Sequence, residues 1–245
     1  VEKNYPNVKC IIPEDNLGYG SALNLGFKNY KFENYLILNP DVEITENQVI
    51  EIYECASNNP NISVLAPSTI DNKNRTNIRH GFFKFLKKHK SEYSDLIKVH
   101  FVIGHAFLIK SKILENSGYF DENYFLNFEE LDLFFKIFKE KYNVYVMKNC
   151  SIKHLEGKSS DYEYFEETSK ISKWHFSWGY YYFYKKNYGK VIAYIFSFFY
   201  FFSCLTKYIY FFIKNDKYRQ KLLLFSIKGL FASLNNKKSF LRPEV

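Results

Sequence analysis

The sequence predicts an α/β domain over residues 1–165, followed by a helical tail over residues 166–245. Three observations predict it. Short apolar runs that end at turn-forming residues alternate with segments of helical periodicity, which is typical of βαβ units and a parallel sheet. Apolar residues make up 47% of the chain, so a packed core is available and disorder of the whole chain is excluded. The last 80 residues differ from the rest in charge and in the length of their apolar runs.

In the first half of the chain, three short apolar runs predict strands, at residues 8–12, 35–38 and 62–66. Each is stopped by residues that favour turns, namely Pro13, Asn39-Pro40-Asp41 and Pro67. A glycine-containing turn over 16–21 leads into a helix that reaches about Tyr30. Thr45 opens a second helix, in which apolar side chains repeat at three and four residues.

In the second half of the domain, residues 68–98 are polar and basic and predict a loop region with a helix near 82–89. Residues 99–110 return to an apolar strand pattern that Gly104-His105 interrupts. An amphipathic helix is expected over 129–141. The last two strands of the domain are expected at 143–147 and 151–154.

The tail is strongly basic. Residues 166–245 carry 14 Lys and Arg against 4 Asp and Glu, whereas residues 1–165 carry 20 against 22. The cations flank an uncharged aromatic run at 191–206, and spanning a bilayer needs about 20 apolar residues. Three interpretations stay open: a transmembrane helix, a helical hairpin lying in the membrane interface, and a helix buried in the body. Long apolar runs beside cations favour an anionic membrane surface as partner over nucleic acid.

The cysteines predict neither a zinc site nor a disulfide framework, because Cys10, Cys55, Cys150 and Cys204 are widely spaced and form no CxxC pair. A reducing, cytosolic compartment is therefore favoured. No secretory signal is visible in residues 1–10, which contain charges and a proline. The chain begins with Val1, so we expect it to be part of a longer product.

Three segments carry side chains suited to chemistry. Asp41 follows a buried strand, and ligands of open α/β sheets bind at the carboxyl ends of strands. Its carboxylate can hold a divalent cation on a diphosphate, although Asn-Pro-Asp alone also reads as a turn. His154 follows the last strand and can contact the same cation or diphosphate, although a lone histidine is more often a surface residue.

The third segment is the start of the helix at 129–141, where Glu129, Glu130 and Asp132 crowd the first turn. The helix macrodipole stabilises carboxylates there, which is the structural explanation. The functional explanation is a general base that takes a proton from an attacking hydroxyl. Neighbouring carboxylates raise one another's pKa whereas the helix terminus lowers it, so this environment is tunable in both directions.

In their order along the chain, these segments resemble family 2 glycosyltransferases of the GT-A fold, in particular the rhamnosyltransferase-like group of bacterial surface polysaccharide synthesis. The resemblance covers about residues 1–160 and rests on Asn16-x-Gly18-Tyr19-Gly20-x-Ala22-x-Asn24-x-Gly26, Leu38-Asn39-Pro40-Asp41, Gly104 within 102–110, Gly118-x-Phe120-Asp121-Glu122-x-Tyr124-Phe125-x-x-x-Glu129-Glu130-x-Asp132-Leu133, and His154-x-x-Gly157-x-Ser159. It implies a Rossmann-like mixed sheet. It also implies an N-terminally incomplete domain, since a nucleotide-binding Asp-Asn-x-Ser segment would precede residue 1.

The resemblance further implies inverting transfer of a sugar from a nucleotide-sugar donor to a lipid-linked or glycan acceptor, with Mg²⁺ or Mn²⁺. From the basic aromatic tail we expect this activity at the cytoplasmic face of the cell membrane. The resemblance matches Asp41 and His154 to metal and diphosphate positions. It matches Glu130 to the base, with Glu129 and Asp132 as alternatives. The matched substrate-binding positions are Asn16, Gly18, Tyr19, Gly20, Asn39, Gly104 and His105.

Two positions depart from the family pattern: Glu130 stands in place of the usual Asp, and His105 in place of a small Ala. An alternative function stays open, that of an inactive remnant that kept the fold but lost its nucleotide half-site and acts as a membrane-bound glycan-binding or scaffold protein. A basic nucleic-acid binder is a third class, which salt-sensitive binding through the tail would reveal.

Overall fold

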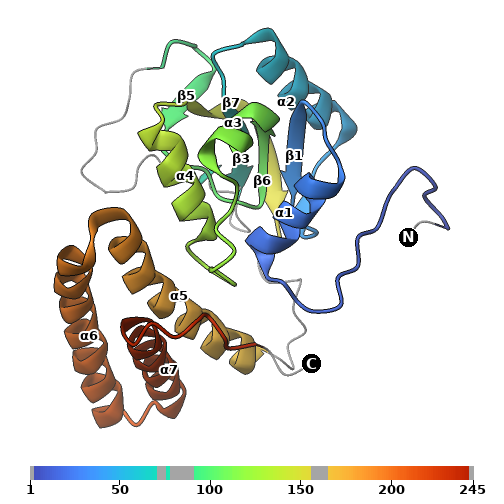
Figure 1. Ribbon diagram of the computed structural model, residues 1–245. Helices are drawn as coiled ribbons and strands as arrows, with labels where there is room; N and C mark the ends of the chain where they lie inside the picture. The colour runs from blue at the N-terminus through green and yellow to red at the C-terminus, as the bar shows by residue number, and fades with distance from the viewer. Residues whose placement is uncertain (1–2, 71–75, 78–90, 156–164, 243–245) are drawn as a thin grey trace.

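The computed structural model describes residues 3–70, 76–77, 91–155 and 165–242 (Figure 1). The helix expected near 82–89 and the positions Gly157 and Ser159 lie outside these residues. The elements of the body are α1 (Tyr19–Asn29), β1 (Asn34–Leu38), β2 (Val42–Glu43), α2 (Glu46–Asn58), β3 (Val64–Ile70), β4 (Thr76–Asn77), β5 (Leu96–Val99), β6 (Ala106–Lys110), α3 (Ser111–Ser117), α4 (Glu129–Lys139) and β7 (Val144–His154). The tail consists of α5 (Phe165–Tyr188), α6 (Lys190–Ile213) and α7 (Lys217–Leu234).

The body is built on one mixed sheet. Its strands follow the order β1-β6-β3-β7-β2, with β4 paired to β3 and β5 paired to β7. Strands β3 and β7 are parallel, whereas β6 lies antiparallel to β1 on one side and to β3 on the other. The strand–helix alternation alone predicted a parallel sheet, and β6 is the reason that the sheet is mixed instead. A mixed sheet is what the GT-A resemblance implies.

Helices cover both faces of the sheet, with α1, α3 and α4 on one face and α2 on the other (Figure 1). Successive residues of β3 serve the two faces in turn, as a strand requires. Val64 and Ala66 belong to the core that contains Phe134 of α4. Leu65 belongs to the core that contains Ile52 of α2. Two apolar layers therefore fix the sheet between its helices.

The strand expected at residues 8–12 is absent from the fold. The Val8 N–H donates to Tyr5 O at 2.9 Å in a turn, and the Ile12 side chain is 88% exposed. An apolar run becomes a strand when a neighbouring strand takes its backbone groups, and none of the described strands pairs with this segment.

Strand β3 does not stop at Pro67 but continues through it to Ile70. The pairing with β7 shifts between Ala66 and Ser68, so the proline lies at an irregularity where its missing N–H costs no ladder hydrogen bond. The two strands expected at 143–147 and 151–154 form one strand, β7, which runs through the same irregularity.

Helix α2 follows its sequence signal closely. Thr45 caps α2 in a capping box, in which Gln48 N donates to Thr45 Oγ1 and Thr45 N donates to Gln48 Oε1.

The strand expected over 99–110 was wrong in its first half: residues 100–105 are not strand, and only β6 forms within it. Strand β5 lies almost wholly before residue 99, in the stretch expected to be a loop. The side chains of His100 and His105 are buried at the two ends of the segment between these strands.

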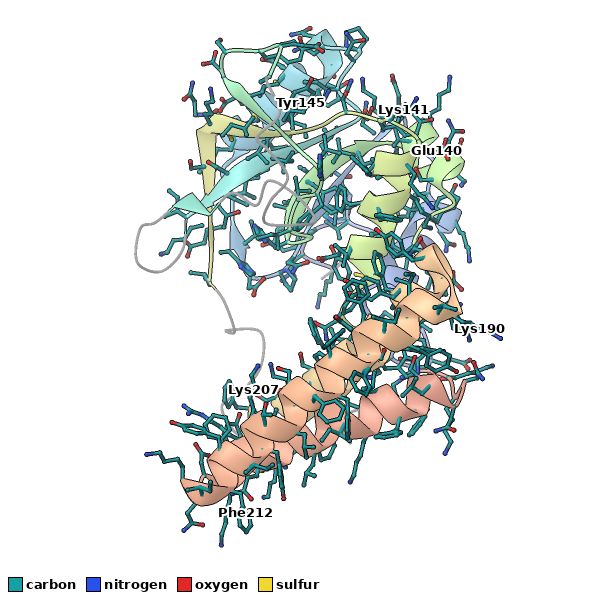
Figure 2. The ribbon with its side chains drawn as sticks, turned by 90° about the vertical axis from the view of Figure 1, so that its left-hand side faces the viewer. Glu140, Lys141, Tyr145, Lys190, Lys207 and Phe212 are labelled. Carbon is teal, nitrogen blue, oxygen red and sulfur yellow. The ribbon has the colours of Figure 1, made fainter. Side chains whose placement is uncertain are left out.

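The tail forms a helical layer below the body (Figures 1 and 2). Helices α5 and α7 pack closely where Gly229 of α7 meets the backbone of Trp174 in α5. A Cβ built on Gly229 would lie 2.1 Å from Trp174 O, so only glycine allows this approach. Helix α6 presents small buried side chains, Ala193, Ser197 and Cys204, to its two neighbours. Helix α6 therefore lies outside the body and is covered on one side by the other tail helices.

The segment after α7 returns along α5 toward the body. The Trp178 indole N–H donates to Lys237 O at 2.8 Å. His175 bonds at both ring nitrogens, with Nε2 2.7 Å from Leu241 O and Nδ1 2.9 Å from Ser239 Oγ. These contacts fix the position of the residues that follow, including Arg242.

Candidate active site

Asp41 and His154 lie side by side at the end of the sheet. The turn after β1 is fixed by Asn39, whose N–H donates to His105 O at 2.8 Å. Strand β2 then pairs with β7, so that Val42 lies opposite His154 and Leu155 N donates to Asp41 O. His154 Nε2 consequently lies 3.2 Å from Asp41 Oδ1, with the two side chains 19% and 11% exposed.

His105 packs directly against the His154 side of this pair. Its ring stacks on that of His154, with centroids 4.4 Å apart and an interplanar angle of 9°. Its Nε2 lies 2.7 Å from Thr69 Oγ1, and its Nδ1 is buried without a hydrogen-bond partner among the described residues. Burial, and then His154, lower the pKa of His105 to about 4, so the ring is neutral at physiological pH.

The three carboxylates at the start of α4 have different surroundings. Asp132 is fully buried and is bonded by Lys186 and Asn187 of α5, at 2.7 and 3.2 Å. Glu129 is 4% exposed, and burial raises its pKa to about 7. Glu130 is half-buried. The three side chains are therefore not interchangeable as a base.

Glu130 lies against the backbone of Gly104. A Cβ built on Gly104 would come within 1.6 Å of Glu130 Oε1. The Tyr19 hydroxyl donates to Gly104 O, and burial together with Glu130 and Glu129 raises the pKa of this phenol. Because Gly104 and His105 are consecutive, the dipeptide has Glu130 beside one residue and the Asp41–His154 pair beside the other.

The glycine turn before α1 packs against Phe125 and against Glu129 at the start of α4. Asn16 Oδ1 accepts from Gly18 N at 3.0 Å. Gly18 has φ of 77°, and a Cβ on it would lie 2.1 Å from Phe125 O. A Cβ on Gly20 would lie 3.3 Å from Glu129 Cβ. This turn therefore needs glycine both for its backbone conformation and for the close approach to the residues before α4.

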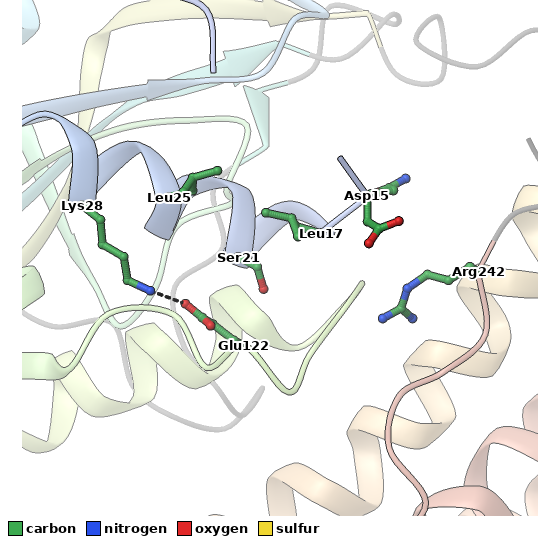
Figure 3. A pocket seen from close by; sticks show the side chains of 8 residues that line it. Asp15, Leu17, Ser21, Leu25, Lys28, Glu122 and Arg242 are labelled. Carbon is green, nitrogen blue, oxygen red and sulfur yellow. Dashed lines mark hydrogen bonds and ion pairs between the residues drawn. The ribbon is translucent and has the colours of Figure 1, made fainter. Parts of the chain in front are cut away.

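A groove of about 630 Å³ opens on the outer side of α1 (Figure 3). Lys28 and Glu122 form an ion pair of 3.0 Å at its wall. The Arg242 guanidinium enters from the tail and stacks on the Phe125 ring at 3.8 Å. The remaining lining residues are Asp15, Asn16, Leu17, Ser21 and Leu25. Of the positions singled out in the sequence, this groove contains Asn16 but neither Asp41 nor Glu130.

Sequence reasoning missed Thr69, Lys186, Asn187 and Arg242. Lys186 and Asn187 were counted only as part of a basic tail, and Thr69 was placed in a loop region. Each meets its partner across at least 36 residues of sequence, so no local pattern reveals the contact.

The Asp41–His154 pair fits part of a divalent cation site. Among the described residues no group of three or more His, Cys, Asp or Glu is arranged to hold a metal ion. Two protein ligands suit a cation that completes its coordination with phosphate oxygens and water. The donor set therefore fits a cation shared with a bound diphosphate better than a closed structural metal site.

Comparison with known proteins agrees with this fold. Residues 1–118 match the family model described as Glycosyl transferase family 2. The Low-salt glycan biosynthesis hexosyltransferase Agl10 of Haloferax volcanii is 25% identical over 153 residues, which are 58% of this chain and 50% of the relative. The chain thus spans half the length of this curated relative.

Among solved structures, the first of the following two shows a similar architecture. The mannosyltransferase PcManGT from Pyrobaculum calidifontis, in complex with GDP-Man and Mn²⁺, has a TM-score of 0.53 at 10% identity, covering 96% of this chain and 72% of that chain. The S. aureus TarS 1-349 structure has a TM-score of 0.48 at 13% identity, covering 96% and 77%. The motifs, the mixed sheet and the match over residues 1–118 make this chain similar to glycosyl transferase family 2, and its fold is the GT-A fold.

Proposed function

We propose that the chain is an inverting glycosyltransferase that moves a sugar from a nucleotide-sugar donor to a lipid-linked or glycan acceptor in cell-surface polysaccharide biosynthesis. One observation carries the proposal. The Gly104-His105 dipeptide has a half-buried carboxylate, Glu130, beside its first residue and the Asp41–His154 pair beside its second. A base and a diphosphate site on the two sides of one short segment are what displacement at a sugar carbon requires.

In this proposal, Asp41 and His154 are the residues that would hold Mg²⁺ or Mn²⁺ at the donor diphosphate. The cation would offset the charge that develops on the leaving diphosphate. The solved relative named above carries Mn²⁺ and GDP-Man, which supports this part of the proposal. His105 and the turn at 16–20 would bind the sugar and the nucleotide.

Glu130 is the proposed base. The acceptor hydroxyl oxygen forms a bond to the anomeric carbon as the bond from that carbon to the diphosphate oxygen breaks, and Glu130 takes the hydroxyl proton. Asp132 is less suited, because it is fully buried and bonded by Lys186. Glu129 is less suited as well, because its side chain is 4% exposed and its Oε2 is buried, which keeps an acceptor hydroxyl away from it.

The experiment compares Asp41→Asn and Glu130→Gln with wild type, using the full chain and UDP-, dTDP- and GDP-sugars. Asp41→Asn should lose donor binding that depends on Mn²⁺, measured by calorimetry with and without EDTA. Glu130→Gln should keep donor binding but lose transfer by about 10²-fold or more. Glu43→Gln, two residues after Asp41 and paired with an exposed Lys153, is the matched control. Turnover that EDTA leaves unchanged would remove the role of Asp41, and absence of donor binding would favour the inactive remnant.

We also propose that the tail attaches the enzyme to the cytoplasmic face of the membrane. Within the described part of the chain, α6 is the one helix long and apolar enough to span a bilayer. Its outer side exposes large apolar residues, including Val191 at 72%, Phe199 at 67% and Ile213 at 77%. Figure 2 shows Lys190 and Lys207 along this helix and Phe212 at its end away from the sheet. An apolar face flanked by cations suits an anionic lipid surface.

A further inference from the structure

The turn that leads into α4 has an unusual backbone. Asn127 and Phe128 have φ of 66° and 71°, in the left-handed region that side-chain-bearing residues rarely adopt. Phe128 is the residue before the helix, and no side chain caps the helix there. Such a conformation persists when surrounding contacts hold it. Glu129 and Glu130 follow at once, so whatever holds this turn also sets the positions of these two carboxylates.

Helix α5 of the tail supplies much of that support. The Phe128 ring occupies the space above Gly179, where a Cβ would lie 2.9 Å from Phe128 Cδ2. It also packs on Phe176, with ring centroids 5.2 Å apart. Asn127 Nδ2 donates to Ser172 O at 3.1 Å. The two left-handed residues are therefore both fixed by one helix of the tail.

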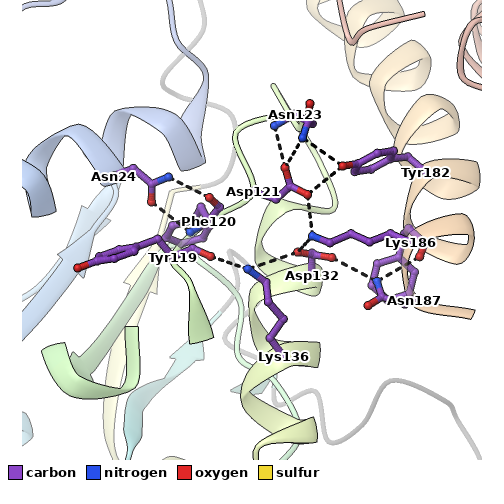
Figure 4. Close-up of polar contacts among 11 residues, drawn as sticks. Asn24, Tyr119, Phe120, Asp121, Asn123, Asp132, Lys136, Tyr182, Lys186 and Asn187 are labelled. Carbon is purple, nitrogen blue, oxygen red and sulfur yellow. Dashed lines mark hydrogen bonds and ion pairs between the residues drawn. The ribbon is translucent and has the colours of Figure 1, made fainter. Parts of the chain in front are cut away.

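Lys186 completes the support by bonding Asp132 in the first turn of α4 (Figure 4). Its ammonium lies 2.7 Å from Asp132 Oδ2 and 2.6 Å from Asp121 Oδ2. Asn187 donates to the other oxygen of Asp132 at 3.2 Å, and Tyr182 donates to Asp121 at 3.1 Å. Asp132 is fully buried, so its charge depends on these donors and on Lys136, 3.7 Å away.

The pKa shifts of Lys186 and Asp121 indicate that the contact between them is ionic. Burial works against the charged form of Lys186, but hydrogen bonds to Asp121 and Asp132 outweigh it and raise the pKa of the lysine. Burial alone would raise the pKa of Asp121, and the bonds from Lys186 and Asn123 lower it overall. The lysine is therefore charged at physiological pH and joins two segments of the body to the tail.

We propose that Lys186 is a positioning residue for transfer. Through Asp132 it fixes the first turn of α4, so that Glu130 lies against Gly104. The reaction therefore depends on docking of the tail against the body. The inference rests on the proposed function. Asp132 N donates to Phe128 O at 2.8 Å, which closes the turn that contains Glu129 and Glu130. Lys186 bonds Asp132 directly, so its effect on Glu130 is transmitted through the turn that Asp132 closes.

The test compares Lys186→Met, Lys186→Arg and Lys185→Met in the full chain. Lys185 is the matched control, because it neighbours Lys186 and bonds Asn236 within the tail. Lys186→Met should lower kcat for transfer at least tenfold while the donor KM stays within about twofold. Lys186→Arg should restore kcat to within about threefold, since a guanidinium also bridges two carboxylates. Wild-type kcat in Lys186→Met, or no recovery in Lys186→Arg, would overturn the proposal.

A second measurement separates this inference from the proposed function. Amide hydrogen exchange at residues 129–133 reports the first turn of α4 whether or not any sugar is transferred. Exchange there should be at least tenfold faster in Lys186→Met than in Lys185→Met or wild type, while exchange in β3 is unchanged. Equal exchange in all three proteins would contradict the positioning role. A wild-type protein without transferase activity would contradict the proposed function. The exchange measurement would still show whether Lys186 fixes the first turn of α4.

Discussion

The Glu130 carboxylate lies in the space that a side chain on Gly104 would fill, since a Cβ there would be 1.6 Å from Oε1 and 2.3 Å from Cδ. Any larger residue at position 104 must therefore displace Glu130. The glycine is needed at this position for the carboxylate rather than for an unusual backbone angle, because Gly104 is not among the residues with positive φ.

Replacing Gly104 with alanine should lower kcat about tenfold or more, because Glu130 moves away from its place beside the dipeptide. The unfolding free energy should change little, since the displaced atoms are the end of a flexible side chain. Gly26→Ala is the control, because a Cβ there meets nothing within 4 Å, and it should stabilise α1 by about 1 kcal/mol. Steady-state kinetics and urea unfolding measure both. Full activity in Gly104→Ala would show that Glu130 is not the base.

Replacing Tyr19 with phenylalanine should remove the hydroxyl that donates to Gly104 O. Because the pKa of this phenol is raised, the hydroxyl keeps its proton across the working pH range and the loss should not depend on pH. We expect kcat to fall several-fold and the unfolding free energy by about 1 kcal/mol. Tyr30→Phe, at an exposed position after the same helix, is the comparison. A pH-dependent difference between the Tyr19 variant and wild type would contradict this account.

Glu129 should make the protein less stable as pH rises. The folded pKa is about 7 against an ordinary value of 4.5, so between these values the folded chain holds a proton that the unfolded chain has released. The unfolding free energy therefore falls through this window, by about 3 kcal/mol in total. The unfolding free energy of Glu129→Gln should not show this decrease. The difference in unfolding free energy between the variant and wild type should therefore be about 3 kcal/mol larger at pH 8 than at pH 4. Urea unfolding at both pH values measures it, with exposed Glu140→Gln as the control.

The apolar face of α6 should carry the membrane affinity. Phe199→Ser with Phe212→Ser removes two side chains that are 67% and 65% exposed. Partition into anionic vesicles should fall at least tenfold, because each buried Phe contributes about 1.5–3 kcal/mol. Cosedimentation measures it, and added salt should weaken the binding further. Phe32→Ser, at a 62% exposed position of the body, is the control. If both proteins bind alike, α6 is not the lipid-facing surface.

Local signals in the sequence were sufficient for the helices and for the order of the site residues. The Thr45–Gln48 capping box and the apolar spacing of α4 depend on residues three or four apart, so one segment contains the whole signal. The strand expected at residues 8–12 was wrong because a strand needs a neighbour, and neighbours are not written locally. The continuation through Pro67 is similar, since a proline is tolerated at the irregularity that β7 provides.

The site itself was predicted in its residues but not in its contacts. Asp41 and His154 meet because β2 pairs with the last residues of β7, across more than a hundred positions of sequence. The surroundings that distinguish Glu130 from Asp132 come from α5, which the charge pattern had marked only as basic. The sequence shows which chemical groups are present, and tertiary contacts determine how deeply each is buried and which groups surround it.

The irregularity in β7 makes the position of His154 sensitive to length rather than to side-chain identity. Ala66 pairs with Val146, and Ser68, two residues on, pairs with Ser151, five residues on. Side chains alternate along a strand, so deleting a single residue from the stretch between these partners would turn every following side chain to the opposite face. The His154 side chain would then point away from Asp41 although the histidine itself is unchanged. A one-residue deletion at this point would therefore remove the contact with Asp41 as completely as substitution of the histidine.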